Sequence, residues 1–254
     1  MNCRGNKPLT FSSSPKATFD TKNKFFLRPL HNEQEYKKLQ NTTGGHCKTK
    51  CVLKQVKQYK LINKMRKLIL VVHISLDGFV AGPKGELDGF DAGEENLEFV
   101  CKLTEEADTA LFGRISYKLL DSYWPTARDN PNATNGEIAY STWYNNAKKI
   151  VISKTITAQN LINTTIISKN ISNEIIKIKE QTGKNILIFG SPTISQSLMQ
   201  PDLIDSYWIF VNPIIFGQGI PLFAGLTNKL KLKLLTTKQF SNGEIALHYI
   251  VDRP

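Results

Sequence analysis

The chain has 254 residues, enough for one large domain or two small ones, and it carries a formal net charge of +11. It has no run of 18 apolar residues, so no membrane-spanning helix is predicted, and its N-terminus lacks the pattern of a secretory signal peptide. Four cysteines are too few for a disulfide framework, which predicts a reducing compartment, the cytoplasm.

The basic excess is confined to residues 1–64, which hold 14 Lys and Arg against 3 Asp and Glu, whereas the rest of the chain holds 19 of each. This segment is rich in Ser, Lys and Pro without a sustained hydrophobic period, which predicts disorder. His46, Cys47 and Cys51 are too few for a predicted metal site, and we expect no metal. We divide the chain at Met65, so that 1–64 is a basic, disordered extension or lies upstream of the natural start. A targeting or nucleic-acid-binding arm is the alternative.

From residue 65 onward, strand and helix patterns alternate. Strands are predicted over 67–75, 108–112, 148–153, 161–167, 185–189, 204–211, 230–240 and 244–251. Helices are predicted over 94–107, 114–122, 137–146, 171–182 and 192–200. Alternation predicts parallel pairing, whereas the turn residues SNG between the last two strands predict an antiparallel hairpin. The predicted class is α/β, with one domain over 65–254 built on a mostly parallel central sheet.

The stretch LFGRISY, residues 111–117, places Gly113, Arg114 and Ser116 where a strand passes into a helix. Ligands of doubly wound sheets lie outside the carboxyl ends of the strands, and a helix N-terminus favours an anion there. Gly113 would allow a ligand to approach the backbone closely, or would serve as a turn residue with positive φ. A plain strand-to-helix turn with an exposed arginine is the other interpretation.

Two further strand ends carry similar groups. In FGSPT, Gly190 precedes Ser191, which is predicted to be a helix N-cap followed by Pro192 at the first helical position. In ISKT, Ser153 and Lys154 suit a phosphate monoester, although a solvated loop lysine is the ordinary alternative. Together these clusters predict a dinucleotide that carries an extra phosphate. A G-x-G-x-x-G motif after the first strand is absent, so a Rossmann site is not predicted.

The motifs SLDGFVAG, LFGRISY, IVISKT, ILIFGSPTISQSLM and LIDSYWIFVNPIIFGQGIPLF, followed by the closing hairpin, resemble in order and spacing the dihydrofolate reductase-like superfamily. The resemblance covers about residues 66–252 and is greatest to the C-terminal reductase domain of the bacterial bifunctional riboflavin-biosynthesis deaminase-reductase and its stand-alone relatives. It implies a three-layer fold, a homodimer, a small-molecule substrate and NADPH-dependent hydride transfer, of the 5-amino-6-(5-phosphoribosylamino)uracil reductase type. The deaminase motifs H-x-E and P-C-x-x-C are absent from the chain.

The resemblance also implies roles for individual residues. It implies that Gly113, Arg114 and Ser116 contact the pyrophosphate and the adenosine phosphates. Ser153 and Lys154 would contact the 2′-phosphate. Gly190, Ser191 and Thr193 would contact the pyrophosphate and the nicotinamide ribose. The loop from Ser75 to Ala81 would cover the nicotinamide, with Asp77 near the reacting centre.

Asp77 and Glu98 are the candidate catalytic residues. Folate reductases place one carboxylate on the first helix, where this chain offers several acids without an obvious choice among Asp91, Glu94, Glu95 and Glu98. Such acids are also ordinary partners of the helix dipole. We expect His73 to be a hydrogen-bonded core histidine rather than a proton donor.

Other functions remain open at this point. Folate reductases carry a Gly-Gly pair where this chain has Gly190-Ser191, so a dihydrofolate reductase, or a reductase of another small carbonyl or imine, is the alternative enzyme. A non-catalytic nucleotide-binding module, or a nucleic-acid-binding protein that uses residues 1–64, belongs to a different class. For 65–254 we expect neither a nucleic acid nor a membrane as partner, because this part has no net charge.

Overall fold

The computed structural model describes residues 65–91, 93–156 and 161–253. The predictions made for residues 1–64, including the disordered extension and the cluster of His46, Cys47 and Cys51, lie outside the described residues. The boundary at Met65 therefore stays a prediction.

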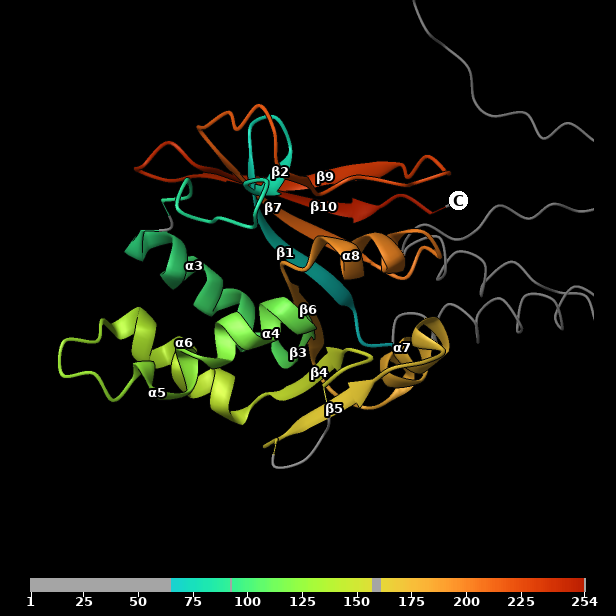
Figure 1. The fold of residues 1–254 in the computed structure, drawn as a ribbon, viewed down its shortest axis with the longest axis horizontal. Coiled ribbons are helices and arrows are strands. Elements are labelled where there is room, and N and C mark those ends of the chain that lie inside the picture. Colours follow the sequence, from blue (N-terminus) through green and yellow to red (C-terminus); the bar gives the residue numbers. More distant parts are fainter. Residues whose placement is uncertain (1–64, 92, 157–160, 254) are drawn as a thin grey trace, which may run out of the picture. The chain divides into compact units, whose positions relative to one another are not determined.

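One eight-stranded sheet forms the centre of the described part, with the strand order β5-β4-β3-β6-β1-β7-β10-β9 (Figure 1). Its strands are β1 (Leu68–Ser75), β3 (Ala107–Gly113), β4 (Lys148–Ile152), β5 (Thr164–Ile167), β6 (Asn185–Phe189), β7 (Ser206–Asn212), β9 (Leu232–Gln239) and β10 (Ile245–Val251). All neighbours from β5 to β7 pair in parallel, and β10 is antiparallel to both β7 and β9. The predicted α/β fold, with its mostly parallel sheet and C-terminal hairpin, is confirmed.

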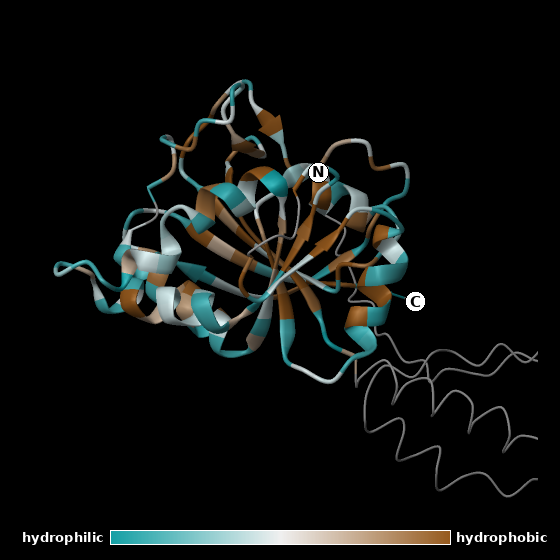
Figure 2. Ribbon diagram, turned by 60° about the horizontal axis from the view of Figure 1, so that its bottom comes forward, coloured by the Kyte–Doolittle hydropathy of each residue, from teal (hydrophilic) through white to brown (hydrophobic). Residues whose placement is uncertain are grey.

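Helices cover both faces of the sheet: α3 (Glu94–Glu105), α4 (Arg114–Asp121), α5 (Trp124–Ala127), α6 (Asn135–Asn146), α7 (Ile171–Glu180) and α8 (Pro192–Met199). Alternate residues of β1 belong to two separate cores, since Ile69 and Val71 pack with α3 and α6 whereas Leu70 and Val72 pack with α7 and α8. This arrangement explains the continuous apolar run of β1, because both of its faces are covered. Figure 2 shows the hydrophobic strands between the more hydrophilic helices.

Three short elements were not predicted: β2 (Phe79–Ala81) and β8 (Ile220–Pro221), which pair as a separate two-stranded sheet, and α5. They are too short to show a hydrophobic period. The strand predicted over 161–167 begins only at Thr164, because the preceding Asn163 has a left-handed backbone with φ 52° that a strand cannot include.

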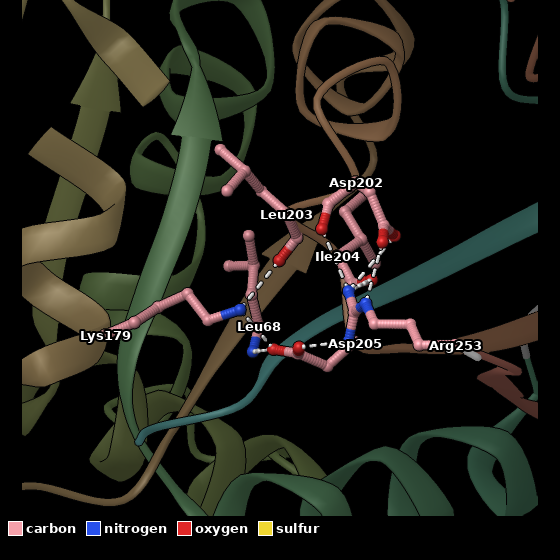
Figure 3. A network of polar contacts seen from close by, with 7 residues as sticks. All are labelled: Leu68, Lys179, Asp202, Leu203, Ile204, Asp205 and Arg253. Carbon is pink, nitrogen blue, oxygen red and sulfur yellow. Dashed lines mark hydrogen bonds and ion pairs between the residues drawn. The ribbon is translucent and has the colours of Figure 1, made fainter. Parts of the chain in front are cut away.

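A network of ion pairs and hydrogen bonds lies at the amino end of the sheet (Figure 3). The buried Lys179 Nζ lies 2.6 Å from Asp205 Oδ2 and donates to the Leu203 carbonyl at 2.9 Å. Asp205 Oδ2 also accepts from the Leu68 amide at 2.8 Å, and Asp205 Oδ1 pairs with Arg253 at 3.0 Å. The network thus joins α7 and the C-terminal residues to the starts of β1 and β7.

A second network joins the starts of β1, β3 and β6. Arg66 pairs with Asp108, donates to Thr109 Oγ1 at 2.6 Å and to the Lys184 carbonyl at 2.7 Å. Burial lowers the pKa of Arg66, and Asp108 opposes that shift. Since these charges are already paired, the amino end of the sheet has a structural role, and a ligand site is expected at the carboxyl end.

Candidate active site

The N-termini of α4 and α8 meet at the carboxyl end of the neighbouring strands β3 and β6. Gly113 is the residue before α4, and its φ is −82°, which any residue adopts. A Cβ atom on Gly113 would collide with Ser191 Oγ and would lie 3.0 Å from Ile194 Cγ1 of α8. The alternative of a positive-φ turn at Gly113 is therefore excluded, and what leaves no room for a Cβ atom here is the close approach of Ser191.

The segment before α8 has an unusual backbone. Gly190 and Ser191 both adopt left-handed conformations, with φ of 57° and 55°. Ser191 occupies the predicted N-cap position, but its side chain accepts no hydrogen bond from the helix, so the predicted side-chain cap is wrong. The left-handed conformation places its hydroxyl beside Gly113 instead.

This arrangement brings backbone and hydroxyl groups close together. A Cβ atom on Gly190 would lie 3.7 Å from Ser116 Oγ in the first turn of α4, so Ser116 borders Gly190 as Ser191 borders Gly113. Neither α4 nor α8 has a side-chain cap, and their positive dipole ends are suited to an anion, although in α8 Pro192 has no N–H and the Ile194 amide already donates to the Ser191 carbonyl at 3.0 Å. The structure brings these four predicted cofactor residues together.

The remaining cofactor candidates lie on the same two helices and after β4, the strand next to β3. Arg114 is exposed at the first position of α4, and Thr193 is exposed at the second position of α8. Ser153 is buried after β4, and its Oγ accepts from the amides of Thr155 and Ile156 at 3.1 and 3.0 Å, so it shapes the local turn. Lys154 is exposed and pairs with no other described residue.

Asp77 joins two loops at the carboxyl end of β1. Its carboxylate accepts from the Ser75 hydroxyl at 2.6 Å and from the amides of Phe216 and Gly217 at 3.1 and 2.8 Å. The Ser75 hydroxyl and these amides hold the pKa of the Asp77 carboxyl below its ordinary value. The carboxylate is thereby kept ionised, which suits an anchor of the Ser75–Ala81 loop better than a proton donor.

The acids of α3 do not face the sheet. The buried residues of this helix are Asn96, Val100 and Thr104, whereas Glu98 is exposed, about 200° around the helix axis from Asn96. Glu95 instead binds the hairpin, accepting from the Ser241 amide and hydroxyl at 3.0 Å each and pairing with Lys238 at 3.0 Å. We therefore assign no proton transfer to Glu98.

A buried polar cluster that the sequence analysis missed lies beside β1. The Glu244 carboxylate, fully buried before β10, has Oε1 2.7 Å from His73 Nδ1 and 3.0 Å from Asn212 Nδ2. Its Oε2 accepts from Asn96 Nδ2 at 2.5 Å. His73 is hydrogen-bonded as expected, but its side chain is 26% exposed, so it is not a core residue. Glu244 follows a hairpin turn, where a carboxylate is normally solvated, and no sequence pattern signalled its burial.

The described residues contain neither a membrane-spanning helix nor a group of metal-ligating side chains. None of the described helices is long and apolar enough to cross a membrane. Nor do residues 65–91, 93–156 and 161–253 contain a group of three His, Cys, Asp or Glu side chains placed to hold a metal ion.

The chain is similar in sequence or in fold to several known proteins. The uncharacterized protein YyaP of Bacillus subtilis is 32% identical over 190 residues, which cover 73% of this chain and 95% of YyaP. The structure of a pyrimidine reductase-like protein from Corynebacterium diphtheriae matches with a TM-score of 0.55 at 15% identity, covering 77% of this chain and 95% of that one. A diaminohydroxyphosphoribosylaminopyrimidine deaminase/5-amino-6-(5-phosphoribosylamino)uracil reductase from Thermotoga maritima matches with a TM-score of 0.55 at 16% identity, covering 79% of this chain and 62% of that one.

The two structural matches have low sequence identity and show the fold alone. The family follows from sequence, because a family model described as the RibD C-terminal domain matches residues 66–246. This range contains both uncapped helix N-termini, the Asp77 loop and the Glu244 cluster. The chain belongs to the RibD C-terminal domain family.

Proposed function

We propose that residues 65–254 form an NADPH-dependent reductase of the 5-amino-6-(5-phosphoribosylamino)uracil reductase type. The observation that carries this proposal is the meeting of the α4 and α8 N-termini, where a Cβ on Gly113 would strike Ser191. Two positive helix ends and the hydroxyls of Ser116 and Ser191 suit the adjacent phosphates of a dinucleotide. Membership of the RibD C-terminal domain family supports a reductase at this site.

The residues at the carboxyl end of the sheet fit this cofactor. Gly113, Ser116, Gly190 and Ser191 would hold the pyrophosphate, and Lys154 would contact the 2′-phosphate. When bound, NADPH supplies a hydride to an oxidised carbon of the substrate. The protein supplies orientation, for which the rigid anchoring of the Ser75–Ala81 loop by Asp77 is suited.

One observation favours a pyrimidine over a folate as substrate. Folate reductases protonate the pterin with a carboxylate on the first helix, but the buried side chains of α3 include the amide of Asn96 and no acid. The relative from Thermotoga maritima is named as a reductase of a phosphoribosylamino-uracil, which points to the same class. A reductase of another small carbonyl or imine is the second candidate, because the proposed cofactor residues would serve it equally.

Replacement of Lys154 tests the cofactor. Lys154→Ala should weaken NADPH binding at least tenfold and leave NADH binding almost unchanged, because a charge-assisted contact to the 2′-phosphate is worth roughly 1.5–3 kcal/mol. Tryptophan emission can report binding, since the Trp143 ring lies 5.8 Å from that of Phe189, next to Gly190. Lys148→Ala, at the other end of β4, is the control and should change neither affinity. Equal losses for both cofactors would contradict the assigned role of Lys154.

Turnover identifies the substrate class. Oxidation of NADPH should be fastest with 5-amino-6-(5-phosphoribosylamino)uracil in a panel that also contains pteridines and small carbonyls. Faster oxidation with a pteridine or a simple carbonyl would replace the proposed substrate by that class.

A further inference from the structure

The cluster of Glu244, His73, Asn96 and Asn212 is not used by the proposed cofactor site, although it lies beside it. Gly190 donates to the Val71 carbonyl of β1 at 3.4 Å. His73 is two residues further along the same strand, about 7 Å towards its carboxyl end at the usual rise of a strand. The histidine therefore lies between Val71 and Ser75, where the proposed cofactor loop begins.

The Glu244 carboxylate fixes the orientation of the imidazole ring. It is fully buried, and the amides of Asn96 and Asn212 bind it from α3 and from the end of β7, so it cannot turn away. Its Oε1 lies 2.7 Å from Nδ1 of His73. A proton on Nδ1 lets the ring donate to this carboxylate oxygen, and we assign that tautomer to the neutral ring.

Aromatic rings flank the imidazole, and that of Phe90 lies 6.3 Å away between centroids. One face of the His73 ring stacks on Phe210, with centroids 4.8 Å apart and planes 19° apart. Nε2 makes no hydrogen bond to any other described residue, and about a quarter of the side chain is exposed. A buried carboxylate that orients one imidazole nitrogen while the other has no hydrogen-bond partner among the described residues is the arrangement of a proton-transfer pair.

We propose that His73 donates the proton in the reduction, through Nε2, and that Glu244 is its positioning residue. This inference rests on the proposed function, which supplies the hydride. It requires a substrate whose nitrogen or oxygen takes a proton as its carbon is reduced, as an imine or a carbonyl does. His73 would replace the helix carboxylate that α3 does not present to the sheet.

The step balances as follows. A hydride from the nicotinamide cofactor forms the new C–H bond, and the cofactor is oxidised by two electrons. The π electron pair of the C=N or C=O bond moves to the nitrogen or oxygen, which takes the proton from Nε2 of the imidazolium. The neutral imidazole that remains keeps its Nδ1 proton, which it donates to Glu244 Oε1, and regains a proton on Nε2 from water.

The test compares two histidines of the full chain. His73→Gln should lower kcat for 5-amino-6-(5-phosphoribosylamino)uracil by at least about 100-fold, the usual contribution of general acid catalysis, with KM and the NADPH affinity within twofold. His248 is the matched control, since it also stacks on an aromatic ring, that of Trp208 at 4.2 Å, and hydrogen-bonds Ser206 Oγ at 2.7 Å. His248→Gln should leave kcat unchanged. A kcat of His73→Gln within threefold of the wild type would overturn the proposal.

A second pair of variants separates the effect of the Glu244 charge on turnover from its effect on folding stability. Glu244→Gln should lower kcat at least tenfold, but its amide would also face the Asn96 amide donor and disturb the fold. Adding Asn96→Asp restores an acceptor there and moves the negative charge away from His73. The double variant should recover the urea midpoint but not kcat. Recovery of both would show that Glu244 has only a structural role.

Nitrogen-15 NMR of the imidazoles shows which ring nitrogen carries the proton and does not depend on turnover. The His73 signals, assigned by their loss in His73→Gln, should show the neutral ring protonated on Nδ1, with or without NADPH. A neutral ring protonated on Nε2 would overturn the proposal. If the wild type bound no NADPH, both the proposed function and this inference would fail. If the wild type bound NADPH and turned over the substrate, and His73→Gln left both unchanged, only this inference would fail.

Discussion

The contact between Gly113 and Ser191 determines how closely the two helix N-termini can approach. Both residues are exceptional, Gly113 because it has no room for a Cβ atom and Ser191 because it holds a left-handed backbone without being glycine. A left-handed backbone costs a residue other than glycine roughly 1–2 kcal/mol, and such strain is often found at functional sites. We infer that the Ser191 hydroxyl is retained at this cost because it borders the phosphate site.

A double-mutant cycle tests this interpretation. Gly113→Ala should cost about 1–3 kcal/mol of unfolding free energy, as expected for overpacking, because its methyl group strikes Ser191 Oγ. Ser191→Gly should be neutral or stabilising, and in its background Gly113→Ala should cost less than about 1 kcal/mol. Urea unfolding of the four proteins measures the coupling. Additive losses would mean that the two residues do not compete for the same space.

At the scale of elements, polar side chains fix the ends of the sheet. Lys179 and Asp205 join α7 to β1 and β7 at the amino end, whereas Glu95 and Glu244 join α3 to the hairpin at the carboxyl end. These contacts link elements far apart in the sequence, so each should contribute to the cooperativity of folding.

The Lys179–Asp205 pair predicts unequal effects of its two partners. Asp205→Asn should cost about 3 kcal/mol or more, because it leaves the buried Lys179 ammonium without a counter-charge. Lys179→Met should cost less than about 1.5 kcal/mol, since a chain of similar volume fills the space and Asp205 keeps Arg253 and the Leu68 amide. Lys177→Met, on the exposed side of α7, is the control and should stay within about 0.5 kcal/mol. Urea midpoints measure all three, and equal losses at Lys179 and Asp205 would contradict the argument.

Glu95 predicts a contribution to stability that depends on pH. The Ser241 amide, together with Lys238 and the Ser241 hydroxyl, lowers the pKa of Glu95 from 4.5 to about 2. A carboxyl group with a depressed pKa stabilises the fold above its unfolded value and loses that contribution as the pH falls through the folded value. Glu95→Gln should therefore be less stable than the wild type at pH 7, and the difference should shrink between pH 4.5 and about pH 2. A difference that is constant over this range would show that the hydrogen bonds act without the charge.

For the whole molecule, the boundary at Met65 decides which part carries the function. The fragment 65–254 should have the same urea midpoint and the same NADPH affinity as the full chain, because it contains the whole sheet and every proposed cofactor residue. A lower midpoint would show that residues 1–64 stabilise the domain. Nucleic-acid binding that weakens with salt and disappears with these residues would instead support a basic arm. The homodimer implied by the resemblance stays a prediction, which the molar mass in solution would test.

Local pattern was sufficient for most of the elements and for the two helix N-termini at which we propose that the cofactor binds. The apolar runs predicted the eight strands of the main sheet, the SNG turn predicted the hairpin, and the Gly-Arg and Gly-Ser pairs indicated two helix N-termini for an anion. These features depend on residues close together in the chain, where periodicity and turn chemistry act. The short elements β2, β8 and α5 were missed because they show no such period.

Contacts between distant residues could be found only in the folded structure. Gly113 and Ser191 are 78 positions apart, and His73 and Glu244 are 171 apart. Nothing in the neighbourhood of Glu244 predicts its burial, because the strand order β1-β7-β10 and the packing of α3 bring Asn96, Asn212 and His73 to it. Hydrophobic pattern specifies which face of an element is buried, but the pairing of buried polar groups depends on the topology that joins those elements.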